Sequence, residues 1–381
     1  MSLRSGLTGA VATVAVTAVA LTVPAAAAPR AADRADHTAT RQAMDAAVTA
    51  GVPGVTAGVR QGSATWGATS GVGDLRTGAP RSPQDHYRIG SITKTFVSTV
   101  MLQLEAEGRL SLDDTVEKWL PGTVRGNGND GRQITLRNLL NHTSGIFNYT
   151  ADEPFVRTHM LEGFPEHRYD TLKPEELVAV AMSHEPDFAP GTSWNYSNTN
   201  YVLAGMVVER VTGHSYAQEI RDRVIKPLGL RATSVPGTKV TVPQPSSRAY
   251  GKFAPTGPTY DVTTMNPSVA SSAGEMISDS SDLNRFYSAL LTGKLLPPKQ
   301  LKEMKTTVPA DEGTPNSGYG LGLMDLTLSC GVHLYGHSGG INGSSSVAVT
   351  TADGSHSLAF NFNSDWTGNS GAVVEAEYCG K

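Results

Sequence analysis

The chain has 381 residues, of which 39% are hydrophobic and 17% are charged, and it carries a formal net charge of −4. This length and hydrophobic content suffice to bury a large core, in one large domain or in two closely packed subdomains. The small negative charge and the lack of a Lys/Arg run argue against nucleic acid as a partner and against a basic membrane-binding surface.

The first residues are typical of a secretory signal peptide. Arg4 precedes an apolar segment at 7–23 and a run of four alanines at 25–28, which supplies an A-x-A cleavage site. Pro29 disfavours cleavage directly before it, so we expect residues 1–27 to be removed and residues 28–381 to be secreted. An uncleaved N-terminal anchor is the alternative. No later segment is long and apolar enough to span a membrane.

The periodicity of the remaining chain predicts strands at both ends and helices between them. We expect helices at 38–50, 91–108, 136–141, 174–183, 198–211, 215–225, 278–291 and 371–378. We expect strands at 55–60, 64–68, 320–326, 332–335, 345–351 and 357–363. This order predicts an α+β fold with two lobes, in which the N- and C-terminal segments form one antiparallel sheet flanked by helices. We expect 40–109 and 270–381 to form the α/β lobe of a single catalytic domain, and 110–269 to form an inserted all-helical lobe.

A Ser-x-x-Lys motif lies at the start of the predicted helix 91–108. Ser91 and Lys94 are three residues apart and therefore share one helical face, which brings the amine within reach of the hydroxyl. A serine becomes a strong nucleophile only when a neighbouring base takes its proton, and Lys94 would be that base. A capping serine beside a surface lysine is the alternative, and the motif alone favours it.

A polar loop precedes the predicted helix 198–211 and contains Tyr196 and Asn198. Such a loop presents side chains into a cleft, where a tyrosine can act as a proton shuttle. An Asn amide there can hold a substrate carbonyl and orient the lysine. A packing tyrosine and a helix-capping Asn are the alternative for this segment taken alone.

A glycine-rich segment at 335–343 follows a predicted strand and contains His337, Ser338, Gly339 and Gly340. Glycines allow a substrate to approach the backbone closely along a sheet edge. The N–H groups of Gly340 and Ser91 would then form an oxyanion hole, with His337 as a polar or cationic wall and Ser338 as a hydrogen-bonding hydroxyl. A hairpin turn with an exposed histidine is the alternative.

The chain has only two cysteines, Cys330 and Cys379. In an exported protein an isolated pair predicts one disulfide, here between a C-terminal strand and the last helix. The Cys and His spacings match no metal-ligand pattern, so we expect no metal site.

Taken together, these segments resemble the three motifs of the penicillin-recognising serine hydrolases, a class C β-lactamase-like family. The three motifs are Ser91-Ile-Thr-Lys94, Tyr196-Ser-Asn198 and His337-Ser-Gly339. The chain is most similar to the exocellular D-Ala-D-Ala carboxypeptidases, and the likeness extends to the segments 139–145, 227–230 and 318–323 and to the cysteine pair. It covers the chain from about residue 40 to the C-terminus.

The resemblance implies residue roles, substrates and partners. Ser91 would be the nucleophile, Lys94 its base or proton relay, Tyr196 the shuttle to the leaving group and Asn198 a ligand of the substrate amide. A D-Ala-D-Ala-type peptide would acylate the serine, and the acyl group would pass to water or an amine. β-Lactams would be inhibitors that acylate the same serine. The family implies no metal or organic cofactor, and we expect a monomer. Whether Lys94 or Tyr196 takes the first proton stays open.

At two positions the sequence differs from the family pattern, and this argues against strict carboxypeptidase specificity. The family's carboxypeptidases bind the terminal carboxylate of the substrate with an arginine and a hydroxyl, at positions that are here Met324 and Gly340. A thioether cannot replace a bidentate guanidinium, so the substrate could be a D-amino-acid peptide, amide or ester without a free carboxylate there. A D-aminopeptidase or endopeptidase, an esterase, a β-lactamase, or a non-catalytic module that binds β-lactams or peptidoglycan are the remaining alternatives.

Overall fold

The computed structural model describes residues 36–254, 257–310 and 317–380. The expected signal segment, 1–27, lies outside the described residues. Within the described ranges no helix has the length and apolar character that crossing a membrane requires.

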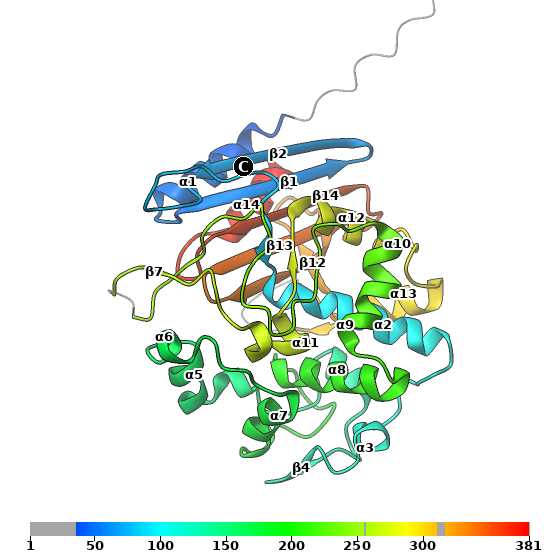
Figure 1. The fold of residues 1–381 in the computed structure, drawn as a ribbon. Helices are drawn as coiled ribbons and strands as arrows, with labels where there is room; N and C mark the ends of the chain where they lie inside the picture. The colour runs from blue at the N-terminus through cyan, green and yellow to red at the C-terminus, as the bar shows by residue number, and fades with distance from the viewer. Residues whose placement is uncertain (1–35, 255–256, 311–316, 381) are drawn as a thin grey trace, which may run out of the picture. The chain divides into compact units, whose positions relative to one another are not determined.

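An eight-stranded antiparallel sheet organises the structure, with the strand order β2-β1-β14-β13-β12-β11-β10-β9 (Figure 1). The chain's first hairpin lies beside its last strand, because β1 pairs with both β2 and β14. The strands of this sheet are β1 (Gly54–Gln61), β2 (Ala64–Gly71), β9 (Val308–Pro309), β10 (Ser317–Tyr319), β11 (Met324–Thr327), β12 (His333–Ile341), β13 (Ser344–Thr351) and β14 (His356–Phe362). The predicted sheet of N- and C-terminal segments is confirmed.

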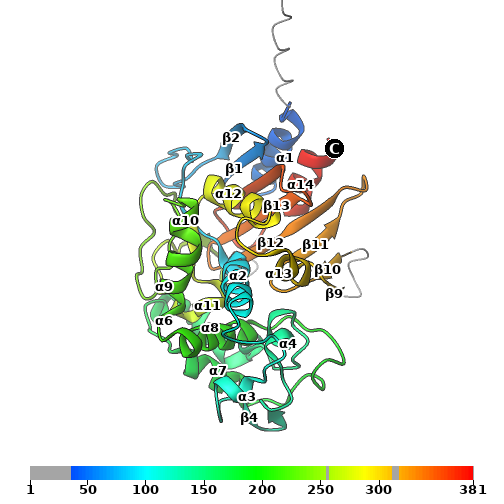
Figure 2. The ribbon, with the colours of Figure 1, turned by 90° about the vertical axis from the view of Figure 1, so that its right-hand side faces the viewer.

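Helices cover both faces of this sheet (Figure 2). Helices α1 (Thr38–Thr49) and α14 (Ser370–Cys379) pack on one face, and α12 (Ser280–Leu291) packs against β1, β13 and β14 on the other. Successive side chains of a strand point to opposite faces of the sheet, so they contribute to two separate hydrophobic cores. Leu358, Phe360 and Phe362 of β14 belong to the core under α1 and α14, whereas Ala359 belongs to the core shared with α12.

The chain between β2 and β9 is mainly helical, and its helices α3, α5, α6, α7 and α8 lie in the lower part of Figure 1. Besides α12, its helices are α2 (Thr93–Ala106), α3 (Val116–Trp119), α4 (Leu136–Leu140), α5 (Glu153–His159), α6 (Phe164–His167), α7 (Pro174–Met182), α8 (Asn198–Thr212), α9 (Tyr216–Ile220), α10 (Lys226–Leu228), α11 (Ser271–Gly274) and α13 (Pro298–Met304). Three short strand pairs interrupt them: β3 (Tyr87–Arg88) with β8 (Ile277–Ser278), β4 (Arg125–Gly126) with β5 (Asn129–Asp130), and β6 (Tyr250–Gly251) with β7 (Tyr260–Asp261).

Two strand predictions are wrong in their bounds. Residues 320–326 do not form one strand, because the chain turns at Gly322, which has φ +70°. A Cβ on Gly322 would lie 2.3 Å from the Ser98 hydroxyl oxygen, so this close packing requires glycine. Strand β12 runs through the glycine-rich segment to Ile341 instead of ending at residue 335. The motif that begins at His337 therefore lies inside a strand.

Cys330 and Cys379 form the predicted disulfide. Cys330 lies in the turn between β11 and β12, and Cys379 is the last residue of α14. The bond ties this hairpin to the helix that covers one face of the sheet.

Candidate active site

Ser91 lies in a single 3-10 turn, Gly90–Ile92, directly before helix α2. The turn packs against the backbone of β12 so closely that no side chain fits between them. A Cβ on Gly90 would lie 2.7 Å from the Gly340 nitrogen, and one on Gly339 would lie 2.0 Å from the Ile89 carbonyl oxygen. The paired glycines thus fix the distance between Ser91 and the glycine-rich strand.

Lys94, in the first turn of α2, is completely buried and lies under Ser91. Its Nζ is 3.0 Å from Ser91 Oγ, 2.7 Å from Asn198 Oδ1 and 2.8 Å from the Ala273 carbonyl oxygen. Burial holds the pKa of Lys94 well below its usual value, since no carboxylate of the described chain forms an ion pair with it. A neutral amine has two N–H donors and one lone pair. The two carbonyl oxygens accept the donors, which leaves the lone pair facing the Ser91 hydroxyl.

Asn198 is the first residue of α8 and is held from two sides. Its backbone N–H donates to Asn148 Oδ1 at 3.0 Å, and its side-chain Nδ2 donates to Thr150 Oγ1 at 2.9 Å. These bonds fix the amide orientation, so that Oδ1 points at Lys94. This contact is the one expected if the Asn198 amide orients the lysine, which is one of its two predicted roles.

Tyr196 lines the same cleft as Ser91, and the serine side chain is near enough to lower the pKa of the phenol against the effect of burial. The Lys94 Nζ is 4.8 Å from the centre of the Tyr196 ring. Burial raises the pKa of Tyr196 above its usual value, so the phenol keeps its proton at neutral pH. Ser91 therefore lies between a neutral amine and a protonated phenol.

His142 contacts Tyr196 and the residues on either side of it, and the sequence analysis did not identify this residue as part of the site. The His142 carbonyl oxygen accepts the N–H of Asn195 at 3.1 Å, and His142 Nδ1 accepts the N–H of Ser197 at 3.2 Å. The imidazole also packs against the Tyr196 ring, with 4.3 Å between centroids. Nδ1 further accepts from Asn200 Nδ2 at 3.2 Å, which places the ring proton on Nε2. Burial holds the pKa of His142 well below its usual value, so it stays neutral.

His337 is buried on β12 and is not a cationic wall. Burial, with the nearby Lys94, lowers the pKa of His337 to about 3, so the imidazole is neutral at pH 7. Its Nε2 hydrogen-bonds to the Tyr319 hydroxyl at 2.8 Å. Ser338 and Gly340 are exposed at the cleft, whereas Gly339 is buried against the Ser91 turn.

A cleft of about 420 Å³ opens in front of Ser91. The described residues that line it are Ser91, Trp194, Tyr196, Ala310, Ser317, Gly318, Tyr319, Met324, Leu326, His337, Ser338, Gly339 and Gly340. This part of the wall contains no Lys, Arg, Asp or Glu. Met324 lies in the wall where the family's carboxypeptidases place their arginine. Trp194 and Tyr319 add aromatic walls that the sequence analysis did not assign, although both stand inside segments that it singled out.

The structure thus brings Ser91, Lys94, Tyr196 and Asn198 together and places the segment 337–340 along one side of the same cleft. The described residues contain no group of three or more His, Cys, Asp or Glu side chains placed to hold a metal ion.

Comparisons with known proteins agree with this geometry. The sequence profile of the Beta-lactamase family matches residues 37–375. Among solved structures, a D-stereospecific amidohydrolase from Streptomyces sp. is 61% identical with a TM-score of 0.88, over 91% of this chain and 99% of that chain. A D-amino acid amidase from Ochrobactrum anthropi SV3, complexed with D-phenylalanine, is 28% identical with a TM-score of 0.77, over 90% of this chain and 99% of that chain.

Among curated proteins, the penicillin-binding protein PbpX of Bacillus subtilis (strain 168) is 28% identical over 267 residues. The match covers 70% of this chain but only 60% of that protein's length.

Proposed function

We propose that this chain, which belongs to the beta-lactamase family of serine hydrolases, is a D-stereospecific amidohydrolase acting through an acyl-enzyme on substrates with an uncharged leaving group. One observation carries the proposal: the buried Lys94 Nζ lies 3.0 Å from the Ser91 hydroxyl oxygen, beside a cleft whose described lining has no Lys or Arg. The names of the two structural neighbours, an amidohydrolase and an amidase specific for D-amino acids, support the stereochemistry.

In the proposed reaction Lys94 is the first base, because its amine is neutral whereas the Tyr196 phenol is protonated. Lys94 takes the Ser91 proton as Oγ attacks the substrate carbonyl carbon. The N–H groups of Ser91 and Gly340 would stabilise the resulting oxyanion, each contributing about 3 kcal/mol. Tyr196 then donates its proton to the leaving amine as the C–N bond breaks, and the Lys94 ammonium returns a proton to Tyr196. Water repeats the sequence on the acyl-enzyme and restores free Ser91.

The cleft wall sets the proposed specificity. Trp194, Tyr319, Met324 and Leu326 offer apolar contacts to a substrate side chain. A substrate that ends in a free carboxylate would place an anion against Met324 without a paired cation, which costs free energy. An amide or ester carries no such charge. The amidohydrolase is therefore better supported than the D-Ala-D-Ala carboxypeptidase that the sequence resemblance implies, although β-lactams remain expected to acylate Ser91.

The decisive experiment compares four substrates with the purified chain. These are D-phenylalanine amide, L-phenylalanine amide, and a D-Ala-D-Ala peptide as its free acid and as its C-terminal amide, with product release followed by chromatography. We expect turnover of the D-amide and of the peptide amide, and none with Ser91→Ala. A strong preference for the L-amide or for the free acid would overturn the proposal. Met324→Arg is the matched variant, in which we expect hydrolysis of the free acid to rise relative to the peptide amide.

Two further tests address inhibitors and location. After exposure to benzylpenicillin, intact-mass analysis should show one adduct on the wild type and none on Ser91→Ala. Secretion stays a proposal that rests on residues 1–28. A mature N-terminus near residue 28 in the medium of an expressing bacterium would support it, and retention of the full chain on cells would contradict it.

A further inference from the structure

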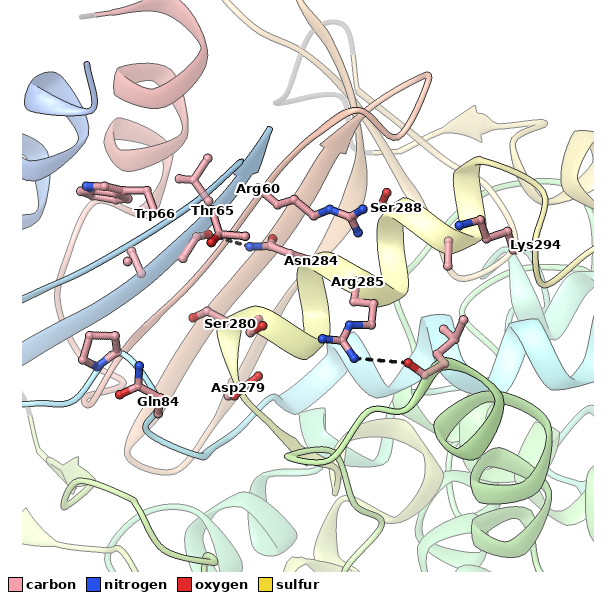
Figure 3. Close-up of a pocket in the computed structure, with 18 of the residues that line it drawn as sticks. Arg60, Thr65, Trp66, Gln84, Asp279, Ser280, Asn284, Arg285, Ser288 and Lys294 are labelled. Atoms are coloured by element: carbon pink, nitrogen blue, oxygen red, sulfur yellow. Dashed lines mark hydrogen bonds between the residues drawn. The ribbon is translucent and has the colours of Figure 1, made fainter. Parts of the chain in front are cut away.

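A second cavity, of about 810 Å³, lies beside the β1–β2 hairpin (Figure 3). It lies between the β1–β2 hairpin, helix α12 and the short helix α10, and it shares no lining residue with the catalytic cleft. The strand order places β1 three strand spacings from β12, or roughly 14 Å across the sheet. The proposed hydrolysis therefore does not use this cavity.

The floor of the cavity is bare backbone. Gly58 of β1 and Gly67 of β2 are register partners, so two neighbouring positions on this face of the sheet lack side chains. A Cβ on Gly58 would lie 3.0 Å from Ser280 Cβ, and a Cβ on Gly67 would lie 3.3 Å from Pro83 Cβ. The next pair on the same face is Arg60 with Thr65, which rises beside the glycines.

Three cations line the cavity, namely Arg60 of β1, Arg285 in the middle of α12 and Lys294 after the end of α12 (Figure 3). None of them forms an ion pair with a carboxylate of the described residues. Arg60 uses only its Nε, which donates to the Gly62 carbonyl, and Arg285 uses one terminal nitrogen on the Leu228 and Gly229 carbonyls. Their other N–H groups are available to a ligand.

The acidic residue of the cavity wall, Asp279, forms no ion pair with these cations. Asp279 lies at the N-terminal end of α12, and its carboxylate accepts the backbone N–H of Asp282 at 2.7 Å as a helix cap. The wall also contains Asn284, which is only 4% exposed and donates Nδ2 to the Gly58 carbonyl at 2.8 Å. Its Oδ1 has no hydrogen-bond partner among the described residues. The charged side chains that line the cavity are therefore three cations and one carboxylate that pairs with none of them.

We propose that this cavity is a binding site for a hydroxylated oxyanion, a sugar-like ligand that carries carboxylate or phosphate groups. Guanidinium groups bind both oxyanions through paired N–H donors, and the ligand hydroxyls would donate to oxygen atoms of the wall. The volume falls within the range of small-molecule sites, about 300–1,000 Å³.

Calorimetric titration of the full chain tests the proposal with two probes. Trigalacturonate supplies carboxylates on a sugar chain, and glucose 1,6-bisphosphate supplies phosphates, so the preferred probe identifies the anion. We expect saturable binding at 50 mM salt that weakens at least fivefold at 300 mM salt, because the contacts are ionic. The double variant Arg60→Gln/Lys294→Gln should bind at least tenfold more weakly.

Two controls separate this site from other binding. Lys302→Gln removes an exposed cation of α13 outside the cavity and should change the affinity less than twofold. Ser91→Ala should leave binding unchanged, so the result does not depend on the proposed catalytic function. Absence of binding by both probes would overturn the inference. So would undiminished binding in the double variant, or an equal loss in Lys302→Gln, with unfolding curves used to verify that each variant folds.

Discussion

The three contacts between His142 and the Tyr196 segment predict that His142 positions the phenol without touching the substrate. The obvious variant, His142→Ala, would test folding more than catalysis. It leaves two buried N–H donors, on Ser197 and Asn200, without their acceptor, at about 1–3 kcal/mol each. Position 142 also has φ +62°, a left-handed conformation that His adopts more readily than Ala, so the change adds a smaller backbone cost. The sum is a large fraction of a typical folding free energy, about 5–15 kcal/mol.

His142→Asn is the informative change. Asn tolerates the left-handed conformation, and its Oδ1 can accept the Ser197 N–H in place of Nδ1. The variant loses the ring that packs 4.3 Å from the Tyr196 ring, so the phenol gains freedom to move. A general acid contributes about 10²–10⁴ in rate, and a displacement of 1 Å can remove about 10² of it. We expect kcat for a D-amino acid amide to fall about 10- to 100-fold, with a smaller change in KM.

The assay compares the amide with the 4-nitrophenyl ester of the same D-amino acid. An amine must be protonated as it leaves, whereas 4-nitrophenolate leaves without a proton, so the ester should lose less than threefold. Tyr196→Phe should show the same contrast, and combining the two changes should add little to either. Equal losses on amide and ester, or fully additive effects of the two changes, would refute the positioning role of His142.

Three further predictions follow from the same structure. Asn198→Asp places a carboxylate next to Nζ of Lys94, so the pKa of Lys94 should rise by about 1–3 units. The acid limb of the plot of kcat/KM against pH should then shift to higher pH. An unshifted limb would argue against Lys94 as the base. Burial raises the pKa of Glu275 from 4.5 to about 7, so the folded state binds this proton more tightly than the unfolded state does. Stability from this group is therefore present below pH 4.5 and lost as pH rises towards 7, by at most about 3 kcal/mol, and urea titrations at pH 5 and 7.5 should show this difference in the wild type but not in Glu275→Gln. Reduction of Cys330–Cys379, which are 49 residues apart, should lower the free energy of unfolding by about 4 kcal/mol, whereas the double Ser variant should not respond to reductant.

The sequence was sufficient to predict the sheet of terminal strands because its alternation is strong there. Residues 345–351 and 357–363 were expected as strands, and β13 and β14 occupy nearly the same positions. The strand bounds are wrong in glycine-rich segments, where the alternation of apolar and polar side chains is interrupted. Position 322 requires glycine because the hydroxyl groups of Ser98 and Tyr201, more than a hundred residues earlier in the chain, lie where a Cβ would be. A long-range contact of this kind has no signal in the local sequence.

The site residues were predictable in type but not in their interactions. Ser91 and Lys94 could be placed together because helical spacing alone brings them onto one face. The contact between Asn198 Oδ1 and Lys94 Nζ joins two helices, and no spacing in the chain indicates it. His142 was visible only as part of a family-like segment, because its function depends on two backbone N–H groups more than fifty residues away.

The surroundings of Lys94 explain why an amide rather than a carboxylate occupies position 198. A buried ammonium next to Asp would be a stable ion pair, and its pKa would be raised, so little free base would exist at neutral pH. Next to carbonyl oxygens the same burial disfavours the charged form and leaves a neutral amine. The amine remains ordered because two fixed acceptors take its protons, and one of them, Asn198, is itself held by Asn148 and Thr150. In the proposed mechanism, the basicity of Lys94 is thus set directly by the Asn198 and Ala273 oxygens and indirectly by the residues that hold Asn198.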